Sequence, residues 1–394
     1  MIVGIVAEFN PMHNGHAHLI NEVRQMGAKC IVASLSSNFV QRGDVSIISK
    51  FARAEAALKS GIDLCLELPV VYSMSTAQNF AFGAVSALCA AGVDTIAFGS
   101  ETADTELLIN IANALNTPEF ESSLSTHLAT GCSFPAARQK AIGDILGNSA
   151  AEVLSNPNDN LGIEYISAAK KINPNIKFIA IKRIGASHDD CNENAICPSA
   201  SFIRKMILSG DFNHGKDFIP EAALQILERE HSLGRIGDIS RLETAVLATL
   251  RSTPKERYSN LPDISEGIEN RLFDAVKGAT SLNELYDIAK TKRYSHARIR
   301  RLTLSAFLGL DNEYFLSPPP YIRILGHTAA GREQLKNGFS KIPAYSRTSE
   351  ITQSKNPAAI KMFNAECRAS DIYELSLEKP SKCGKEFLEK IIAL

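Results

Sequence analysis

Short apolar runs alternate with amphipathic helical segments over residues 1–210, and this alternation constrains the fold more than any other feature of the chain. Apolar runs bounded by turn residues are typical of buried parallel strands, and the helices between them are typical of crossover connections. The sequence therefore predicts an α/β fold with a doubly wound parallel sheet. The predicted strands cover residues 1–6, 29–35, 62–68, 95–98 and 176–181.

The first predicted strand runs directly into a polar turn, AEFNPMHNGH, and a helix is predicted over Ala17–Met26. Ligands of open α/β sheets bind at such turns, because helix N-termini and free amides converge there. His13 and His16 can point the same way at the mouth of the helix, and Gly15 lets a phosphate come close. Two neutral imidazoles can donate hydrogen bonds to phosphate oxygens and stabilise the charge that develops as pyrophosphate leaves.

The run His13-Asn14-Gly15-His16 resembles the HxGH signature of the nucleotidyltransferase superfamily related to class I aminoacyl-tRNA synthetases. Two histidines at this spacing can also be a chance pair or a metal-binding pair. Their position at the first strand-to-helix turn favours nucleotide chemistry, because the structural context supports the motif. The resemblance implies a Rossmann-like fold for the parallel sheet.

Residues near other strand and helix ends add candidate contacts to a nucleotide. Gly99 follows the fourth strand and leaves room for an adenine or a ribose, although a tight turn explains it equally well. Asn158 can read a base or a ribose, or it can cap a helix. Arg183 ends the fifth strand and suits a phosphate. Ser199, Ser201 and Arg204 around a helix start predict a phosphate clamp and resemble the second signature of the superfamily.

The stretch after the second strand, Ser36–Asp44, is predicted to be a loop that contacts the ligand. Ser49 can then cap a helix that runs to residue 60. Lys50 and Arg53 lie near its start, an unfavourable place for cations unless an anion is nearby. Taken alone, these two side chains are interpreted as part of a solvated helix face.

The chain of 394 residues has room for two domains, and its formal net charge of −1 excludes a globally basic nucleic-acid-binding protein but not a local basic patch. Met1 leads straight into a strand, so no signal peptide is predicted. No apolar run is long enough to cross a membrane, and the eight cysteines form no CxxC pair, so a cytoplasmic protein with free thiols is expected. His188, Cys191 and Cys197 fit no standard zinc spacing, so no protein-held metal is predicted.

Residues 210–218 are interpreted as a linker, after which the pattern becomes helical. Residues 219–394 are therefore predicted to form a mainly helical second domain. This domain is expected to include a short apolar strand before Gly326 and a small αβ tail from Lys341. Its helices are predicted over residues 221–231, 239–251, 268–275 and 282–290.

One segment of the second domain is strongly basic, and no acidic residue follows it before Asp311. Aromatic side chains lie among its cations, a pattern that suits an RNA backbone and unstacked bases. A helix wetted by lysine and arginine is the alternative, but the missing counter-charges favour RNA. The predicted RNA-binding residues are Lys292, Arg293, His296, Arg298, Arg300 and Arg301.

Longer stretches resemble the tRNA(Met) cytidine acetate ligase family of bacterial RNA-modifying enzymes over nearly the whole chain. The matching stretches are GIVAEFNPMHNGHAHL, FVQRGDVSIISKFARAEAAL, SGIDLCLELP, AFGSE, NPNDNLGIEY, SASFIRK, KRYSHARIRR and PPPYIRILG. The chain departs from the family pattern at Ser37, where the family has glycine.

The resemblance implies that acetate attacks the α-phosphate of ATP, which gives acetyl-adenylate and pyrophosphate. The exocyclic amine of the wobble cytidine in elongator tRNA(Met) then takes the acetyl group and becomes N4-acetylcytidine. His13 and His16 are the implied catalytic residues, the basic segment holds the anticodon stem, and Mg²⁺ arrives with ATP. The implied ATP site consists of Val6, Ala7, Glu8, Phe9, Asn10, Pro11, Met12, His13, Asn14, Gly15, His16, Ala17, His18, Leu19, Gly99, Asn158, Arg183, Ile184, Ser201 and Arg204.

Glu8 is the one carboxylate inside the first motif, and we expect it to orient acetate or to accept a proton from the cytidine amine. Two other functions stay open. One is a nucleotidyltransferase that acts on a small metabolite, which the long helical domain with its basic segment argues against. The other is a non-catalytic factor that binds nucleotide and RNA, which His13, His16 and Arg204 argue against. Acetate-dependent exchange between ATP and pyrophosphate separates the three.

Overall fold

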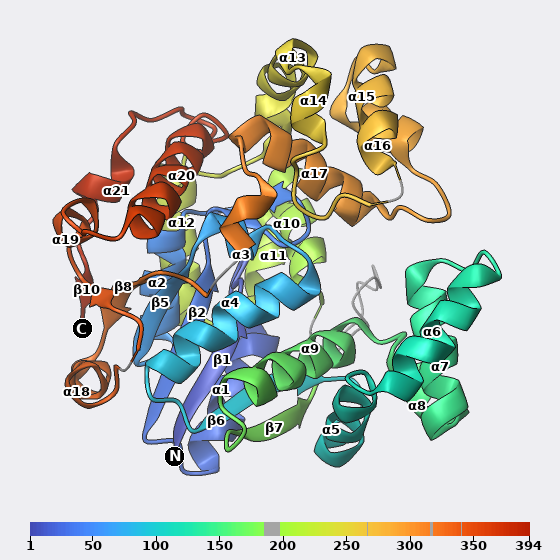
Figure 1. Ribbon diagram of the computed structural model, residues 1–394. Coiled ribbons are helices and arrows are strands. Elements are labelled where there is room, and N and C mark those ends of the chain that lie inside the picture. The colour runs from blue at the N-terminus through green and yellow to red at the C-terminus, as the bar shows by residue number, and fades with distance from the viewer. Residues whose placement is uncertain (185–197, 266, 316–317, 340) are drawn as a thin grey trace.

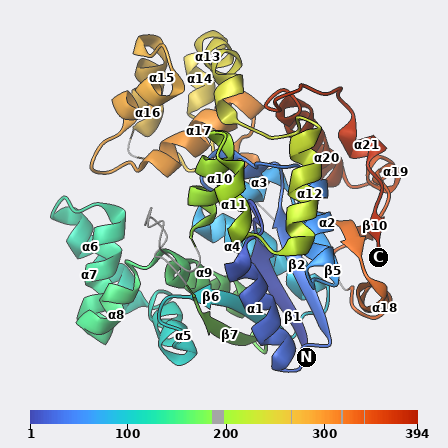
Figure 2. The same cartoon turned by 180° about the vertical axis from the view of Figure 1, so that it is seen from behind.

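A computed structural model describes residues 1–184, 198–265, 267–315, 318–339 and 341–394. A twisted sheet lies at its centre, and helices cover both faces of this sheet (Figures 1 and 2). The strand order is β10-β8-β5-β2-β1-β6-β7, and β9 pairs with β8 outside this path. The strands are β1 (Ile2–Ala7), β2 (Cys30–Ser36), β5 (Leu64–Leu68), β6 (Thr95–Ser100), β7 (Lys177–Lys182), β8 (Ile322–His327), β9 (Ala344–Tyr345) and β10 (Ile392–Ala393).

The predicted parallel sheet is confirmed, because β5, β2, β1, β6 and β7 run in the same direction. In this register Ile2 lies opposite Cys30, and Thr95 lies opposite Lys177. Successive side chains of β2 point to opposite faces, so Ile31 packs in one core and Val32 in the other. The apolar runs are thus buried on both faces, as expected for parallel strands joined by helices.

The two faces of the sheet carry different sets of helices, which the two apolar cores define. One face is covered by α1 (Asn14–Gln25), α2 (Lys50–Lys59), α10 (Ala200–Leu208), α11 (Phe212–Gly215) and α12 (Glu221–Ser232). The other is covered by α3 (Val70–Ser73), α4 (Ala77–Ala90), α5 (Thr105–Ala114) and α9 (Pro157–Ile172), with α6 (Pro118–Ala129), α7 (Phe134–Leu146) and α8 (Asn148–Val153) beyond them.

The chain returns to the same sheet after its helical part. Strand β8 pairs antiparallel with β5, with Leu64 opposite His327, and β10 pairs with β8. The predicted strand before Gly326 therefore exists, but it covers the edge of β5 instead of standing within a separate helical domain. An uncovered edge would leave the backbone groups of β5 unpaired. The predicted linker at residues 210–218 does not mark the end of the sheet, and part of it forms α11.

The remaining helices lie above one end of the sheet and along its β8 edge (Figure 1). No helix among the described residues has the combination of length and apolar character that a membrane crossing needs. These helices are α13 (Glu243–Ser252), α14 (Lys255–Tyr258), α15 (Ile268–Gly278), α16 (Leu282–Ala289), α17 (His296–Leu308), α18 (Ala329–Asn337), α19 (Thr348–Thr352), α20 (Pro357–Tyr373) and α21 (Lys385–Leu388).

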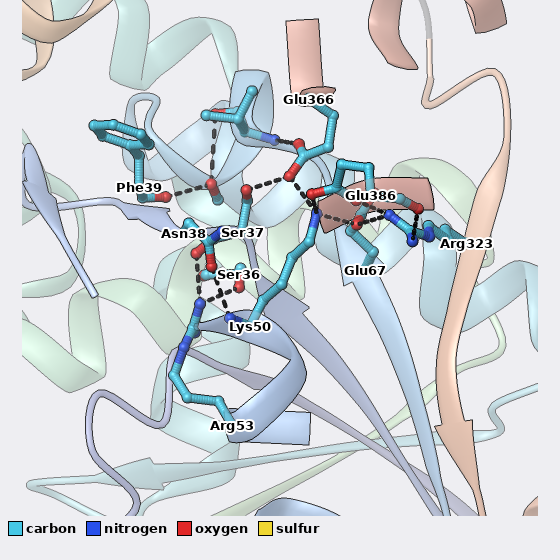
Figure 3. Close-up of polar contacts among 12 residues, drawn as sticks. Ser36, Ser37, Asn38, Phe39, Lys50, Arg53, Glu67, Arg323, Glu366 and Glu386 are labelled. Carbon is cyan, nitrogen blue, oxygen red and sulfur yellow. Dashed lines mark hydrogen bonds and ion pairs between the residues drawn. The ribbon is translucent and has the colours of Figure 1, made fainter. Parts of the chain in front are cut away.

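The predicted solvated face of α2 is wrong, because Lys50 and Arg53 are fully buried. Lys50 Nζ contacts carboxylate oxygens at 2.5, 2.6 and 2.8 Å, which belong to Glu67, Glu366 and Glu386 (Figure 3). These partners come from β5, α20 and α21. The ammonium is therefore neutralised by residues that are distant in sequence, and this compensates for its removal from water.

Candidate functional site

The two histidines of the HNGH run form the N-terminus of α1, which begins at Asn14 and so earlier than predicted. His13 is the N-cap residue, and its Nδ1 accepts a hydrogen bond from the backbone N–H of Gly15 at 3.1 Å. His16 Nδ1 accepts from the backbone N–H of His13 at 3.2 Å. The rings stack with their centroids 3.8 Å apart. Because each Nδ1 is an acceptor, each neutral ring carries its proton on Nε2.

The surroundings of His16 keep this ring neutral. Burial, then the neighbouring His13, then Arg183 hold the pKa of His16 well below its ordinary value of 6.5. The imidazole is therefore uncharged at neutral pH and presents an Nε2–H donor. A neutral donor can bind a phosphate oxygen without first exchanging a proton with it.

Two cavities meet at these histidines. The smaller has a volume of about 110 Å³, and the larger has a volume of about 370 Å³. His13 and His16 line both, so the rings are accessible from a hollow and not enclosed in the apolar core. The shared walls consist of Val6, Ala7, Phe9, His13, His16, Asn158, Leu161, Tyr165 and Arg183.

Most residues of the predicted ATP site lie on the walls of these cavities, and six do not. The predicted residues on the walls are Val6, Ala7, Glu8, Phe9, Asn10, His13, Gly15, His16, His18, Leu19, Gly99, Asn158, Arg183 and Ile184. Those away from the walls are Pro11, Met12, Asn14, Ala17, Ser201 and Arg204. Met12, for example, packs in the apolar core between the sheet and α1.

The predicted phosphate clamp holds the protein's own backbone. Arg204 donates to the carbonyl oxygen of Asn10 at 2.7 Å and to Ser201 Oγ at 3.1 Å. Ser199, the other hydroxyl of the predicted clamp and the N-cap of α10, lies on the wall of the larger cavity, as does Ala200. Burial lowers the pKa of Arg204, although Asp44 and Glu8 act in the opposite direction. In this arrangement Arg204 fixes the turn that carries the histidines.

Asn158 and Arg183 line both cavities together with the two histidines. Asn158 Oδ1 accepts from Arg183 Nη1 at 3.3 Å, and its backbone N–H and side-chain amide both donate to Glu101. Asn156, and not Asn158, is the N-cap residue of α9. At Gly99 a Cβ atom would lie 3.3 Å from Arg183 Cγ, so this glycine gives the arginine side chain its room. Asn158 thus lies on the cavity wall, as a nucleotide contact requires, and does not cap α9.

Glu8 and Asn10 are fixed by the segment that follows β2. Glu8 Oε1 accepts from the backbone N–H of Gln41 at 2.9 Å, and Asn10 Oδ1 accepts from Ile47 N at 2.8 Å. Arg53 donates to the backbone oxygen of Glu8 at 2.6 Å. The segment contains a short hairpin of β3 (Phe39–Val40) and β4 (Asp44–Val45), where only a loop was predicted.

Several wall residues were not predicted from the sequence. Gln41 and Arg42 lie in the stretch that is predicted to contact a ligand, although the sequence does not indicate which of its residues do so. Phe80 and Tyr165 lie on α4 and α9, and their helical apolar pattern is the same as that of core residues. Arg138 on α7 pairs with Glu164 at 2.7 Å. Only the three-dimensional fold brings these side chains to one cavity.

The predicted RNA-binding segment forms the start of α17 and the residues before it. Lys292 and Arg293 are exposed. The argument from missing counter-charges is wrong for Arg298 and Arg301, because Asp263 lies 3.3 and 3.5 Å from their guanidinium nitrogens. Asp263 lies well before this segment in the sequence, so the residues next to the segment do not reveal its counter-charge.

The residues weighed for zinc, His188, Cys191 and Cys197, lie outside the described part of the chain. Among the described residues, no three or more histidine, cysteine, aspartate or glutamate side chains gather in a way that could hold a metal ion.

The sheet, the HNGH helix start and the hollow beside it define a class of protein. A model of the HIGH nucleotidyl transferase family matches residues 1–386. The chain thus belongs to the HIGH nucleotidyl transferase family.

Full-length relatives narrow this class. The tRNA(Met) cytidine acetate ligase of Fervidobacterium nodosum is 37% identical, with 100% of this chain and 99% of the relative covered. The enzyme of that name from Caldanaerobacter subterraneus has the same identity and coverage. The crystal structure of apo Thermotoga maritima TmcAL superposes on this chain with a TM-score of 0.93 and is 33% identical in sequence. The crystal structure of TmcAL bound with alpha-thio ATP has a TM-score of 0.91 and is 32% identical. Each comparison covers 100% of this chain and 99% of the other chain. The chain belongs to the tRNA(Met) cytidine acetate ligase family.

Proposed function

We propose that the protein activates acetate with ATP and transfers the acetyl group to the exocyclic amine of the wobble cytidine in elongator tRNA(Met). The histidine pair carries the proposal. The two imidazoles are stacked, and the Nδ1 atom of His16 accepts a backbone N–H group, so this neutral ring presents its Nε2–H as a donor for a phosphate oxygen. Such donors, fixed beside a hollow, suit a reaction in which charge develops on a leaving pyrophosphate.

The smaller cavity is the proposed nucleotide side of the site. Gly99 and Phe98 lie on one part of its wall, and Lys182 and Arg183 lie on another. The wall at Phe98 and Gly99 suits an adenine or a ribose, and the cations suit phosphates. Mg²⁺ enters with ATP as part of the substrate. Acyl adenylation needs positioning and charge stabilisation more than a protein nucleophile, and this site supplies both.

The protein is proposed to act in the cytoplasm. The cysteines of the described residues are free thiols, which is typical of a reducing compartment.

Exchange of labelled pyrophosphate into ATP tests the first step. We expect exchange that depends on added acetate, followed by N4-acetylcytidine at the wobble position once tRNA is added, measured by mass analysis of the nucleosides. Exchange without acetate dependence would indicate a nucleotidyltransferase that acts on a small metabolite. No exchange in the presence of tight RNA binding would indicate a non-catalytic factor.

A further inference from the structure

The larger cavity extends past the histidines to a part of the molecule that the proposed nucleotide site does not use. Its far walls come from α4, α7 and the β3–β4 hairpin. Its volume of about 370 Å³ falls in the usual range of small-molecule pockets, about 300–1,000 Å³. The walls that it does not share with the smaller cavity include Gln41, Arg42, Phe80, Arg138 and Asn160.

We propose that this cavity receives the unstacked cytosine ring of the acceptor RNA, with the exocyclic amine bound by the carboxylate of Glu8. This inference rests on the proposed function and assigns the place and the recognition of its second substrate. It makes Glu8 the residue that distinguishes cytosine from uracil.

Glu8 has the chemistry that this recognition needs. It is the one carboxylate among the described residues that line the cavity, and the backbone N–H of Gln41 holds its Oε1 at 2.9 Å. An ionised carboxylate only accepts hydrogen bonds, so it pairs with the amino group of cytosine. Uracil presents a carbonyl oxygen at the same position, which a carboxylate repels.

Aromatic side chains provide walls for a base. Phe80 and Tyr165 line the cavity from α4 and α9, and both are buried. Tyr165 is held in place by Phe98, with ring centroids 6.0 Å apart and planes at 67°. Burial, and then the charge of Glu8, raise the pKa of Tyr165, so the phenol and the carboxylate share one environment. Unstacked RNA bases are commonly held by aromatic rings in this way.

The charges around the cavity suit a base that is still part of an RNA strand. Arg42, Arg138 and Arg183 line it, while Glu8 is its acidic member. Arg138 is oriented by Glu164 at 2.7 Å. Because Glu164 offsets the charge of Arg138, Arg42 and Arg183 supply the positive charge among the described wall residues. A free nucleobase needs no such cations, whereas the phosphates on either side of a nucleotide do.

The hairpin between β3 and β4 connects this cavity to the predicted RNA-binding segment. Gln41 contributes to the cavity wall, and its carbonyl oxygen accepts from Arg301 of α17 at 3.3 Å. Gly43 (φ 73°) packs directly on α17, where a Cβ atom would lie 2.5 Å from Arg300 Cβ. RNA that lies along α17 therefore reaches the cavity across the width of one hairpin.

Glu8 is the proton acceptor in the proposed transfer step. The N4 atom attacks the carbonyl carbon of acetyl-adenylate, and a C–N bond forms. The bond between that carbon and the phosphate oxygen breaks, and AMP leaves with the electron pair. The nitrogen gives up one proton, which Glu8 takes and passes to solvent.

Binding of two RNA stem-loops tests the assignment without any turnover. The probes are anticodon stem-loops that differ only in having cytidine or uridine at the wobble position. We expect the wild type to bind the cytidine form about 10-fold more tightly, a ratio within the range of a single base contact. In Glu8→Gln this ratio should fall below about 3, because the new amide can donate to uracil. Glu152→Gln, at an exposed position on α8, is the matched control and should keep the wild-type ratio.

An unchanged ratio in Glu8→Gln, or a wild type that binds both stem-loops equally, would overturn the assignment. The two half-reactions give a second readout. In Glu8→Gln, we expect the rate of acetyl transfer from supplied acetyl-adenylate to fall by a factor at least about 50 times larger than the fall in the rate of pyrophosphate exchange. Glu8→Asp should restore part of the transfer rate. Equal losses, or a raised KM for acetate with normal RNA discrimination, would mean that Glu8 serves acetate instead. Failure of the proposed function itself would appear differently, as a wild type with no acetate-dependent exchange.

Discussion

Lys50 Nζ lies 2.6 Å from Glu366 Oε1, and neither side chain has any solvent exposure. The contact joins α2, which lies beside the turn that carries the histidines, to α20 near the end of the chain. One turn further along α2, Arg53 donates to the backbone oxygens of Glu8 and Ser37. The C-terminal helices are therefore locked to the helix that fixes the backbone of the site (Figure 3).

Replacement of Lys50 with methionine should lower the free energy of unfolding by about 3–5 kcal/mol, the range for one partner of a buried ion pair. The loss is large because the buried carboxylates of Glu67, Glu366 and Glu386 would lose their shared ammonium, and Arg323 contacts only two of these three, Glu67 and Glu386. Urea unfolding followed by circular dichroism measures it. Lys59→Met is the control on the same helix, where the side chain is 39% exposed and the change should stay below about 1 kcal/mol. Equal effects of the two substitutions would contradict the assigned role of Lys50.

Glu67, which belongs to this cluster of buried charges, should make the stability of the protein depend on pH. Burial raises its pKa from 4.5 to about 7, although Lys50 lowers it. Between these values the folded protein binds a proton that the unfolded chain has lost, so this group's contribution to stability falls as pH rises from about 4.5 to 7. Glu67→Gln lacks this titration.

Between pH 5 and pH 8, we therefore expect the free energy of unfolding of Glu67→Gln to rise by about 2 kcal/mol relative to that of the wild type, an order-of-magnitude figure for this pKa shift. Urea midpoints at the two pH values provide the measurement. The exposed Glu152→Gln should follow the wild type at both. If the curves of Glu67→Gln and the wild type stayed parallel, Glu67 would not be the titrating group.

The positions of the histidines could be predicted because they depend on local sequence. His13 and His16 lie at the end of the sheet because a strand, a turn and the start of a helix follow one another within a few residues. This placement does not depend on the fold of the rest of the chain. The stretch Ser36–Asp44 is predicted to contact a ligand for the same reason, and Gln41 does lie on the cavity wall. The identity of the contacting residue within that loop depends on the hairpin, which local sequence did not reveal.

Features that depend on distant residues could not be predicted. The burial of Lys50 is stable only because Glu366 and Glu386 arrive from the other end of the chain. Likewise, the counter-charge of Arg301 comes from Asp263, and β8 returns to the edge of β5. A single sequence records none of these pairings, since each joins segments whose separation is set by the whole fold.

His16→Ala should reduce acetate-dependent pyrophosphate exchange by about 10²- to 10³-fold, the usual cost of one donor that stabilises developing charge. His16→Gln should retain more activity than His16→Ala, because its amide nitrogen can replace the Nε2–H donor. His214→Gln, at an exposed position on α11, is the control. Proton NMR of the ring should also show no titration of His16 between pH 6 and pH 8, because burial depresses its pKa. A ring that titrates near pH 6.5 would contradict the neutral donor.

Lys292 and Arg301 should affect RNA binding in different ways, although both belong to the predicted RNA-binding segment. Lys292 is exposed, so Lys292→Ala should reduce the salt dependence of tRNA affinity by about one unit in log–log slope, as expected for one lost phosphate contact. Arg301 is engaged with Asp263 and the carbonyl of Gln41, so Arg301→Ala should leave that slope nearly unchanged and instead weaken acetyl transfer by loosening the hairpin beside Glu8. Affinities measured from about 50 to 300 mM salt, together with single-turnover transfer, distinguish the two. Equal salt slopes for the two variants would mean that Arg301 leaves its protein partners to bind RNA.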